Sequence, residues 1–167
     1  HVAKLRRMAG MEGVAETDVL FRGAEVSPSY GYNVWYVAAA TLTRLSAADA
    51  FAAWFYIVPI LVVLQVLAYY AFARALFEDD ALAFCAAFGF LIFLLLDAQG
   101  MSWVAAPLPF LVAHHLLFFP ALTLALRSMD ERGPGLKVAS GFLGGSAFAI
   151  HAFVPFYVLF AAGGLAL

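Results

Sequence analysis

Charged residues are scarce in this chain. Asp, Glu, Lys and Arg make up 12% of its 167 residues, whereas a soluble domain carries about 25%. The few charges are also unevenly placed, because four long stretches contain none: residues 50–73, 81–96, 98–126 and 138–167. A solvated surface along these stretches is excluded, and with it an ordinary soluble globular fold.

Cysteine and the motifs of soluble enzymes are almost absent as well. Cys85 is the single cysteine, so a disulfide framework is excluded. The sequence has no glycine-rich phosphate loop, no HExxH zinc motif, no GxSxG nucleophile motif and no Cys/His cluster with metal-ligand spacing. No residue is therefore assigned as a metal ligand, and the cofactor stays unknown, with a divalent metal left open.

Apolar residues are what the chain has in excess, at 65% of the sequence. Lipid offers no hydrogen bonds to a backbone, so only helices and closed barrels cross it, and a helix needs about 20 residues to do so. We therefore predict an all-α fold, a polytopic transmembrane helical bundle with interfacial amphipathic helices. The predicted spans cover about residues 50–74, 81–96, 105–127 and 138–162, and Pro59 and Pro120 are expected to kink the first and third.

Residues 1–49 are predicted to form an external region with two short helices. Val2, Leu5 and Met8 recur at helical spacing among basic residues, which favours an amphipathic helix in the membrane interface over residues 1–11. An ordinary solvated surface helix is the alternative. Residues 33–45 form the second helix, which is too short to span. Asn33 is its expected N-cap, and Ser46 to Asp49 reads as a capping box for the next helix.

The loop between these helices, residues 12–32, is unusually long and carries carboxylates. Loops of more than about 12–15 residues are often functional. Glu16 and Asp18 are candidate general bases, and solvated loop acids are the plainer interpretation. Tyr32 and Trp35 either stack on a sugar or anchor the chain at the interface.

Few polar side chains interrupt the predicted spans. A histidine within a membrane helix is often functional, and it can also simply bond a neighbouring backbone, so His114, His115 and His151 carry both interpretations. Gln65 is interpreted as an interhelical hydrogen bond. The basic loop at residues 127–137 is predicted to be cytoplasmic, which places residues 1–49 and 97–104 outside.

The order of these segments resembles a known family. Five segments follow one another: His1-Val2-Ala3-Lys4-Leu5-Arg6-Arg7, a carboxylate-bearing loop, Ser29-Tyr30-Gly31-Tyr32-Asn33-Val34-Trp35-Tyr36, a short helix with Arg44-Leu45, and a long span ending Ala73-Arg74-Ala75-Leu76-Phe77. This layout is similar to the first large external loop and following helices of GT-C-type integral membrane glycosyltransferases. The resemblance implies a multi-helix membrane bundle that transfers a sugar from a polyprenyl-phosphate donor on the outer face.

The resemblance also implies roles for particular residues. Asp18 and Glu16 are the loop carboxylates left as candidates for the catalytic base, and they are merely loop acids if the family's base precedes His1. The side chains expected to bind substrate are His1, Lys4, Arg6 and Arg7 near the donor phosphate, Tyr32, Asn33 and Trp35 along the sugar or acceptor, and His115. In the family the acidic residue commonly lies just ahead of a position like His1. We therefore expect this chain to be a fragment of a longer protein, in which the base either precedes His1 or lies in the loop.

Two other classes of function stay open. A secondary transporter or channel segment would also place broken helices and polar groups within the bundle. A non-catalytic membrane scaffold subunit would only pack against other helices. The expected partners are the lipid-linked sugar donor, membrane lipids and the remaining helices of the full-length chain, with no nucleic acid. The expected location is a bacterial-type cytoplasmic membrane, crossed several times.

Overall fold

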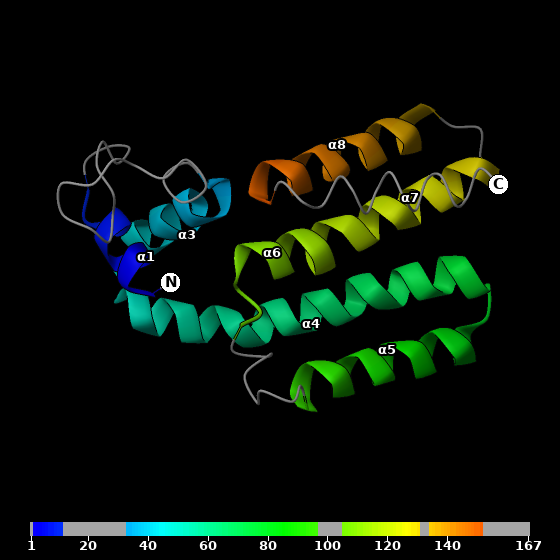
Figure 1. Cartoon of the computed structure of the whole chain (residues 1–167), viewed down its shortest axis with the longest axis horizontal. Helices are drawn as coiled ribbons and strands as arrows, with labels where there is room; N and C mark the ends of the chain where they lie inside the picture. Colours follow the sequence, from blue (N-terminus) through cyan, green and yellow to red (C-terminus); the bar gives the residue numbers. More distant parts are fainter. Residues whose placement is uncertain (1, 12–32, 97–104, 131–133, 152–167) are drawn as a thin grey trace. The chain divides into compact units, whose positions relative to one another are not determined.

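The computed structural model describes residues 2–11, 33–96, 105–130 and 134–151 (Figure 1). Every regular element within these ranges is a helix, which confirms the all-α prediction for the part of the chain that is described. The chain divides into two compact units, His1–Ile57 and Val58–Leu167. The predicted boundary, at residue 49, lies about two helical turns earlier.

The first unit contains α1 (Val2–Ala9) packed against α3 (Val34–Leu45). Both predicted helices are thus confirmed. Lys4 differs from its expected place on the basic face of an amphipathic helix, because it is only 2% exposed. Its ammonium lies 4.5 Å from the centroid of the Tyr36 ring, a cation–π contact that lets the side chain stay buried. The exposed basic residues of α1 are therefore Arg6 and Arg7.

Side-chain caps fix where the helices of this unit begin. The Asn33 carboxamide accepts hydrogen bonds from the backbone N–H groups of Trp35 and Tyr36, which confirms the predicted N-cap. The predicted capping box starting at Ser46 is wrong, because the Ser46 hydroxyl donates to the Thr43 carbonyl and so closes α3 instead. Asp49 caps the next helix.

Helix α4 (Ala50–Phe77) is the longest of the described elements, and it continues through Pro59. It ends at Glu78, whose φ of 55° is left-handed, and the predicted tight turn leads into α5 (Asp80–Leu96). Arg74 and Asp80 form an ion pair across this turn. Both helices thus begin within a residue of their predicted starts.

The third predicted span is a helix of mixed geometry. Its parts are α6 (Pro109–Leu111), a π-helical segment η1 (Val112–Phe118) and α7 (Phe119–Asp130). The helix begins at Pro109 and not at the predicted residue 105. Pro120 has no N–H for the carbonyl of Leu116, and a wider π-helical turn precedes it where a kink was expected.

Helix α8 (Pro134–Ile150) runs back along α7 and η1 (Figure 1). The Ser140 hydroxyl donates to the Ala121 carbonyl at 2.8 Å. Pro134 sits in the first turn of this helix, where its missing N–H removes no hydrogen bond. The remainder of the predicted fourth span, residues 152–162, lies outside the described residues.

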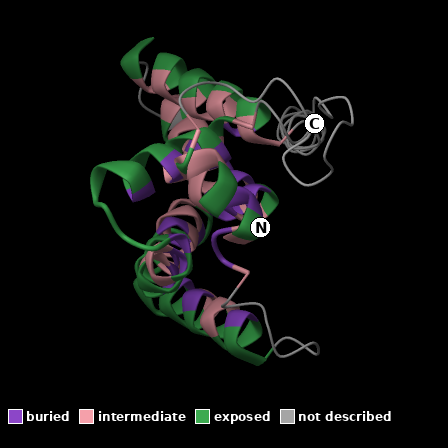
Figure 2. Ribbon diagram, turned by 90° about the vertical axis from the view of Figure 1, so that its left-hand side faces the viewer, coloured by how far each residue is buried: buried purple, intermediate pink, exposed green. Residues whose placement is uncertain are grey.

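Among the residues that the structure describes, two helices are long and apolar enough, by length and composition, to cross a membrane: Ala50–Phe77 and Pro109–Met129. Helix α5 is apolar but shorter, at 17 residues. Large apolar side chains are exposed on α5 and α8, where Phe84 is 65% and Phe142 73% exposed, and Figure 2 colours the exposed residues green.

Candidate functional site

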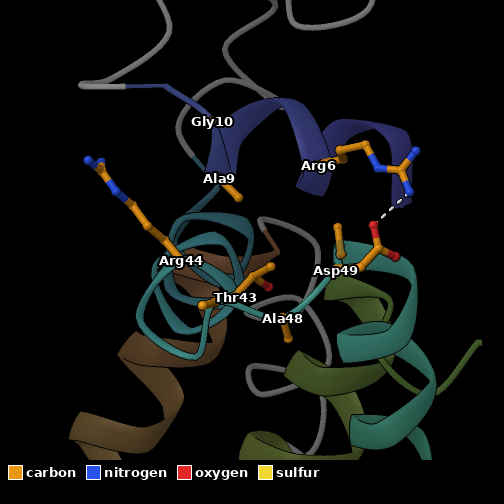
Figure 3. A pocket seen from close by; sticks show the side chains of 9 residues that line it. Arg6, Ala9, Gly10, Thr43, Arg44, Ala48 and Asp49 are labelled. Atoms are coloured by element: carbon orange, nitrogen blue, oxygen red, sulfur yellow. Dashed lines mark hydrogen bonds and ion pairs between the residues drawn. The ribbon is translucent and has the colours of Figure 1, made fainter.

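A pocket of about 280 Å³ lies in the first unit, beside the turn that joins α3 to α4 (Figure 3). Helix α1 forms one wall, and the end of α3 and the start of α4 form the other. The residues that line it are Arg6, Ala9, Gly10, Thr43, Arg44, Ala47, Ala48, Asp49 and Ala50. Because most of these side chains are small, the charged groups at its edge dominate its chemistry.

An ion pair between Arg6 and Asp49 marks one side of this pocket (Figure 3). Arg6 Nη2 lies 2.8 Å from Asp49 Oδ1, and both side chains are more than half exposed, at 65% and 53%. Asp49 Oδ2 accepts hydrogen bonds from the N–H groups of Phe51 and Ala52. The bond from Phe51 and the one from Arg6 both lower the pKa of Asp49, so this carboxylate is ionised at neutral pH.

Arg44 lines the pocket with its stem, while its guanidinium points away from Arg6 and Asp49 (Figure 3). That guanidinium donates to the Met11 carbonyl at 3.2 Å. Thr43, which also lines the pocket, is 5% exposed, and its hydroxyl donates to the Ala39 carbonyl within α3. Arg6 is therefore the cation best placed to change partners, since guanidinium pairs equally well with carboxylate and with phosphate oxygens.

The predicted site residues fall into three groups. His1, Glu16, Asp18 and Tyr32 lie outside the described residues. Lys4, Arg7, Asn33 and Trp35 are described but do not line the pocket: Lys4 is buried over Tyr36, Asn33 caps α3, Trp35 is half-buried, and Arg7 is exposed on α1. Arg6 is the predicted residue that lines it, and His115 lies in the second unit.

Asp49 and Arg44 line the pocket although neither was a candidate. The sequence places Asp49 in a predicted helix start, and in the structure its carboxylate caps α4. Its second contact, with Arg6, joins residues 43 positions apart. Local pattern contains no information about a pair at that separation, so only packing of α1 on α3 brings it together.

The second unit contains a different polar cluster, made by Gln65 and His115. Gln65 is fully buried and His115 is 8% exposed. Gln65 Nε2 donates to the Ala106 carbonyl at 3.0 Å, and its Oε1 lies 3.3 Å from His115 Nδ1. This confirms Gln65 as an interhelical hydrogen-bonding residue, joining α4 to the residues ahead of α6 and to η1.

Aromatic rings enclose this polar cluster. The His115 ring meets Phe90 edge-on at 5.0 Å and stacks on Phe119 at 5.9 Å between centroids. Tyr69 in turn stacks on Phe90 at 4.5 Å and meets Phe119 edge-on at 5.0 Å. Within the ranges that the structure describes, no group of three or more His, Cys, Asp or Glu side chains is arranged to hold a metal ion.

The fold and its two polar sites define a class: a helical chain with two helices long and apolar enough to cross a membrane, carrying a charged pocket in one unit and a buried amide–imidazole pair in the other. No family model, no curated protein and no solved structure matches the chain.

Proposed function

We propose that this chain belongs to a polytopic helical bundle of a bacterial cytoplasmic membrane and is part of a GT-C-type glycosyltransferase. Residues 1–49 lie on the outer side, where a sugar passes from a polyprenyl-phosphate donor to an acceptor. The observation that carries the proposal is the pocket with Arg6 at its edge, on a short basic helix that precedes a long apolar one.

The reaction needs a cation beside the donor. The acceptor oxygen forms a bond to the anomeric carbon, the bond from that carbon to the phosphate oxygen breaks, and the polyprenyl phosphate leaves with the electron pair. The Arg6 guanidinium offsets the charge that develops on this leaving group. A carboxylate takes the proton of the acceptor hydroxyl, and Asp18 or Glu16 is the residue proposed for it.

Asp49 gives the free pocket its resting state. One oxygen of its carboxylate pairs with the Arg6 guanidinium, while the other accepts a hydrogen bond from the backbone at the start of α4. A phosphate that enters takes over the contact to Arg6, and Asp49 remains bound to the backbone N–H groups. The exchange replaces one charged hydrogen bond with another, so it needs no refolding of α1 or α4.

The test compares Arg6→Ala with Arg7→Ala in the protein reconstituted in lipid vesicles with a radiolabelled polyprenyl-phosphate sugar. Arg7 is the matched control, because it lies on the same helix but does not line the pocket. Loss of a charged hydrogen bond costs about 1.5–3 kcal/mol, so Arg6→Ala is expected to raise the KM for the donor about tenfold or more. Equal donor KM values in the two variants would remove Arg6 from this role.

Asp18→Asn and Glu16→Gln test the base in the same assay. One of them is expected to abolish transfer while leaving donor binding intact. If both variants transfer sugar at the rate of the unaltered protein, the base lies elsewhere. Donor that is neither bound nor consumed by folded protein would contradict the enzyme proposal as a whole.

The second candidate is a segment of a secondary transporter or channel. The buried Gln65–His115 pair and the π-helical segment favour it, because transporters place polar groups and irregular helices within the membrane. Flux of a labelled sugar into vesicles without covalent transfer would support this class. A scaffold subunit would show neither flux nor transfer.

A further inference from the structure

Gln65 has a fixed orientation because of what lies on its two sides. Its carboxamide faces the Ala106 carbonyl at 3.0 Å and the His115 ring at 3.3 Å. A carbonyl oxygen accepts hydrogen bonds and never donates them. The NH₂ group of Gln65 must therefore face Ala106, and its oxygen must face His115 Nδ1. Reversing the amide would put two acceptor oxygens against each other in a buried site.

That orientation decides which nitrogen of His115 carries the proton. The Gln65 oxygen accepts, so the nitrogen that faces it has to donate, and that nitrogen is Nδ1. We propose that Gln65 holds His115 in the Nδ1–H form, so that Nε2 of the neutral ring is a hydrogen-bond acceptor. Gln65 is then a positioning residue for His115.

The surroundings keep this arrangement rigid. Gln65 has no exposed surface, and it ties α4 to the chain just before α6 as well as to η1. Phe90 and Phe119 contact two sides of the imidazole and limit its rotation. The π-helical geometry of residues 112–118 is of the kind often found at functional sites.

The protonation state has a consequence for the ligand, and this part rests on the proposed function. An acceptor nitrogen binds a hydroxyl or an amide N–H and has no proton to give to a phosphate oxygen. If His115 contacts substrate, it contacts a hydroxyl of the sugar or acceptor. The donor phosphate is then bound by Arg6 and not by His115.

The test is nitrogen NMR of the chain in lipid vesicles, with ¹⁵N-labelled histidine and His115 assigned by its loss in His115→Gln. The unaltered protein is expected to show the proton on Nδ1. Gln65→Met removes the acceptor at nearly constant volume and is expected to abolish this preference. Leu64→Met is the control, because it introduces the same side chain at an exposed neighbouring position of α4.

Gln65→Glu covers the case in which the methionine variant does not fold. The buried carboxyl group is expected to be protonated, donating from its O–H to the Ala106 carbonyl and accepting from Nδ1–H with its other oxygen, so the expected signal of His115 is that of the unaltered protein. A proton on Nε2 in the unaltered protein, or an Nδ1–H signal that persists in Gln65→Met, would overturn the proposal. None of these signals depends on sugar transfer, so the result stands apart from the test of the enzyme.

Discussion

Different interactions stabilise each of the two units. In the first, a cation–π contact, two helix caps and an exposed ion pair fix two short helices and the start of a third. In the second, aromatic rings and one buried amide join long apolar helices. Apolar packing and a buried hydrogen bond thus stabilise the second unit, whereas caps and charged contacts stabilise the first.

The largest expected effect comes from the ring cluster of the second unit. Phe119 contacts the rings of Tyr69 at 5.0 Å and Phe72 at 5.4 Å. Aromatic pairs contribute about 0.5–1.5 kcal/mol each, so Phe119→Ala is expected to lower the free energy of unfolding by about 2 kcal/mol.

Unfolding in mixed detergent micelles, followed by tryptophan fluorescence, measures this change. Phe84→Ala is the matched control, because Phe84 is 65% exposed and, among the residues described, its ring contacts that of Phe88. Equal losses in the two variants would show that ring packing does not stabilise the second unit.

A smaller effect is expected from the cap of α3 in the first unit. Asn33→Ala removes the acceptor for two N–H groups, and the loss of such a cap costs about 1 kcal/mol. Asn33→Ser keeps an acceptor oxygen and is expected to retain most of that stability. Circular dichroism during the same titration follows the helix content. An alanine variant as stable as the serine variant would contradict the role of the cap.

The smallest effects are expected at two left-handed residues, one in each unit. Ala47 has a φ of 50° and Glu78 has a φ of 55°. A side chain is strained there and glycine is not, so each change to glycine is expected to stabilise its own unit by about 0.5 kcal/mol, after the entropy cost of glycine. Comparing the two unfolding transitions checks whether Ala47→Gly and Glu78→Gly act on separate units. A loss of stability in either variant would count against the strain.

Much of the helical layout is predictable from local rules. Long stretches without charge indicate α4 and α5, and Asn33 ahead of an apolar run indicates the start of α3. The start of α6 was missed because residues 105–108 are as apolar as a helix. Pro107 lies in this stretch and Pro109 directly follows it, and both limit where the helix begins, since a residue before proline avoids helical geometry.

The candidate sites were harder to predict. Composition marks Arg6 as a cation beside apolar residues, and a polar residue in an apolar run marks Gln65 and His115. The sequence pattern does not reveal that Asp49 pairs with Arg6 or that the Ala106 carbonyl fixes the orientation of the Gln65 amide. Both contacts join residues more than 40 positions apart, and such contacts depend on how whole helices pack.

Local sequence pattern is enough to predict that the described part of the chain is helical, where most of these helices lie and which few of their residues are polar. The physical reason is local: hydrophobic periodicity, caps and breakers act over a few residues. Tertiary structure alone decided that Lys4 is buried over Tyr36, that Arg6 meets Asp49 at a pocket, and that His115 faces an acceptor oxygen. These outcomes follow from which helix faces meet. Burial requires Lys4 and His115 to find a partner of the right kind, whereas the exposed Arg6 meets Asp49 because the packing of α1 brings them together.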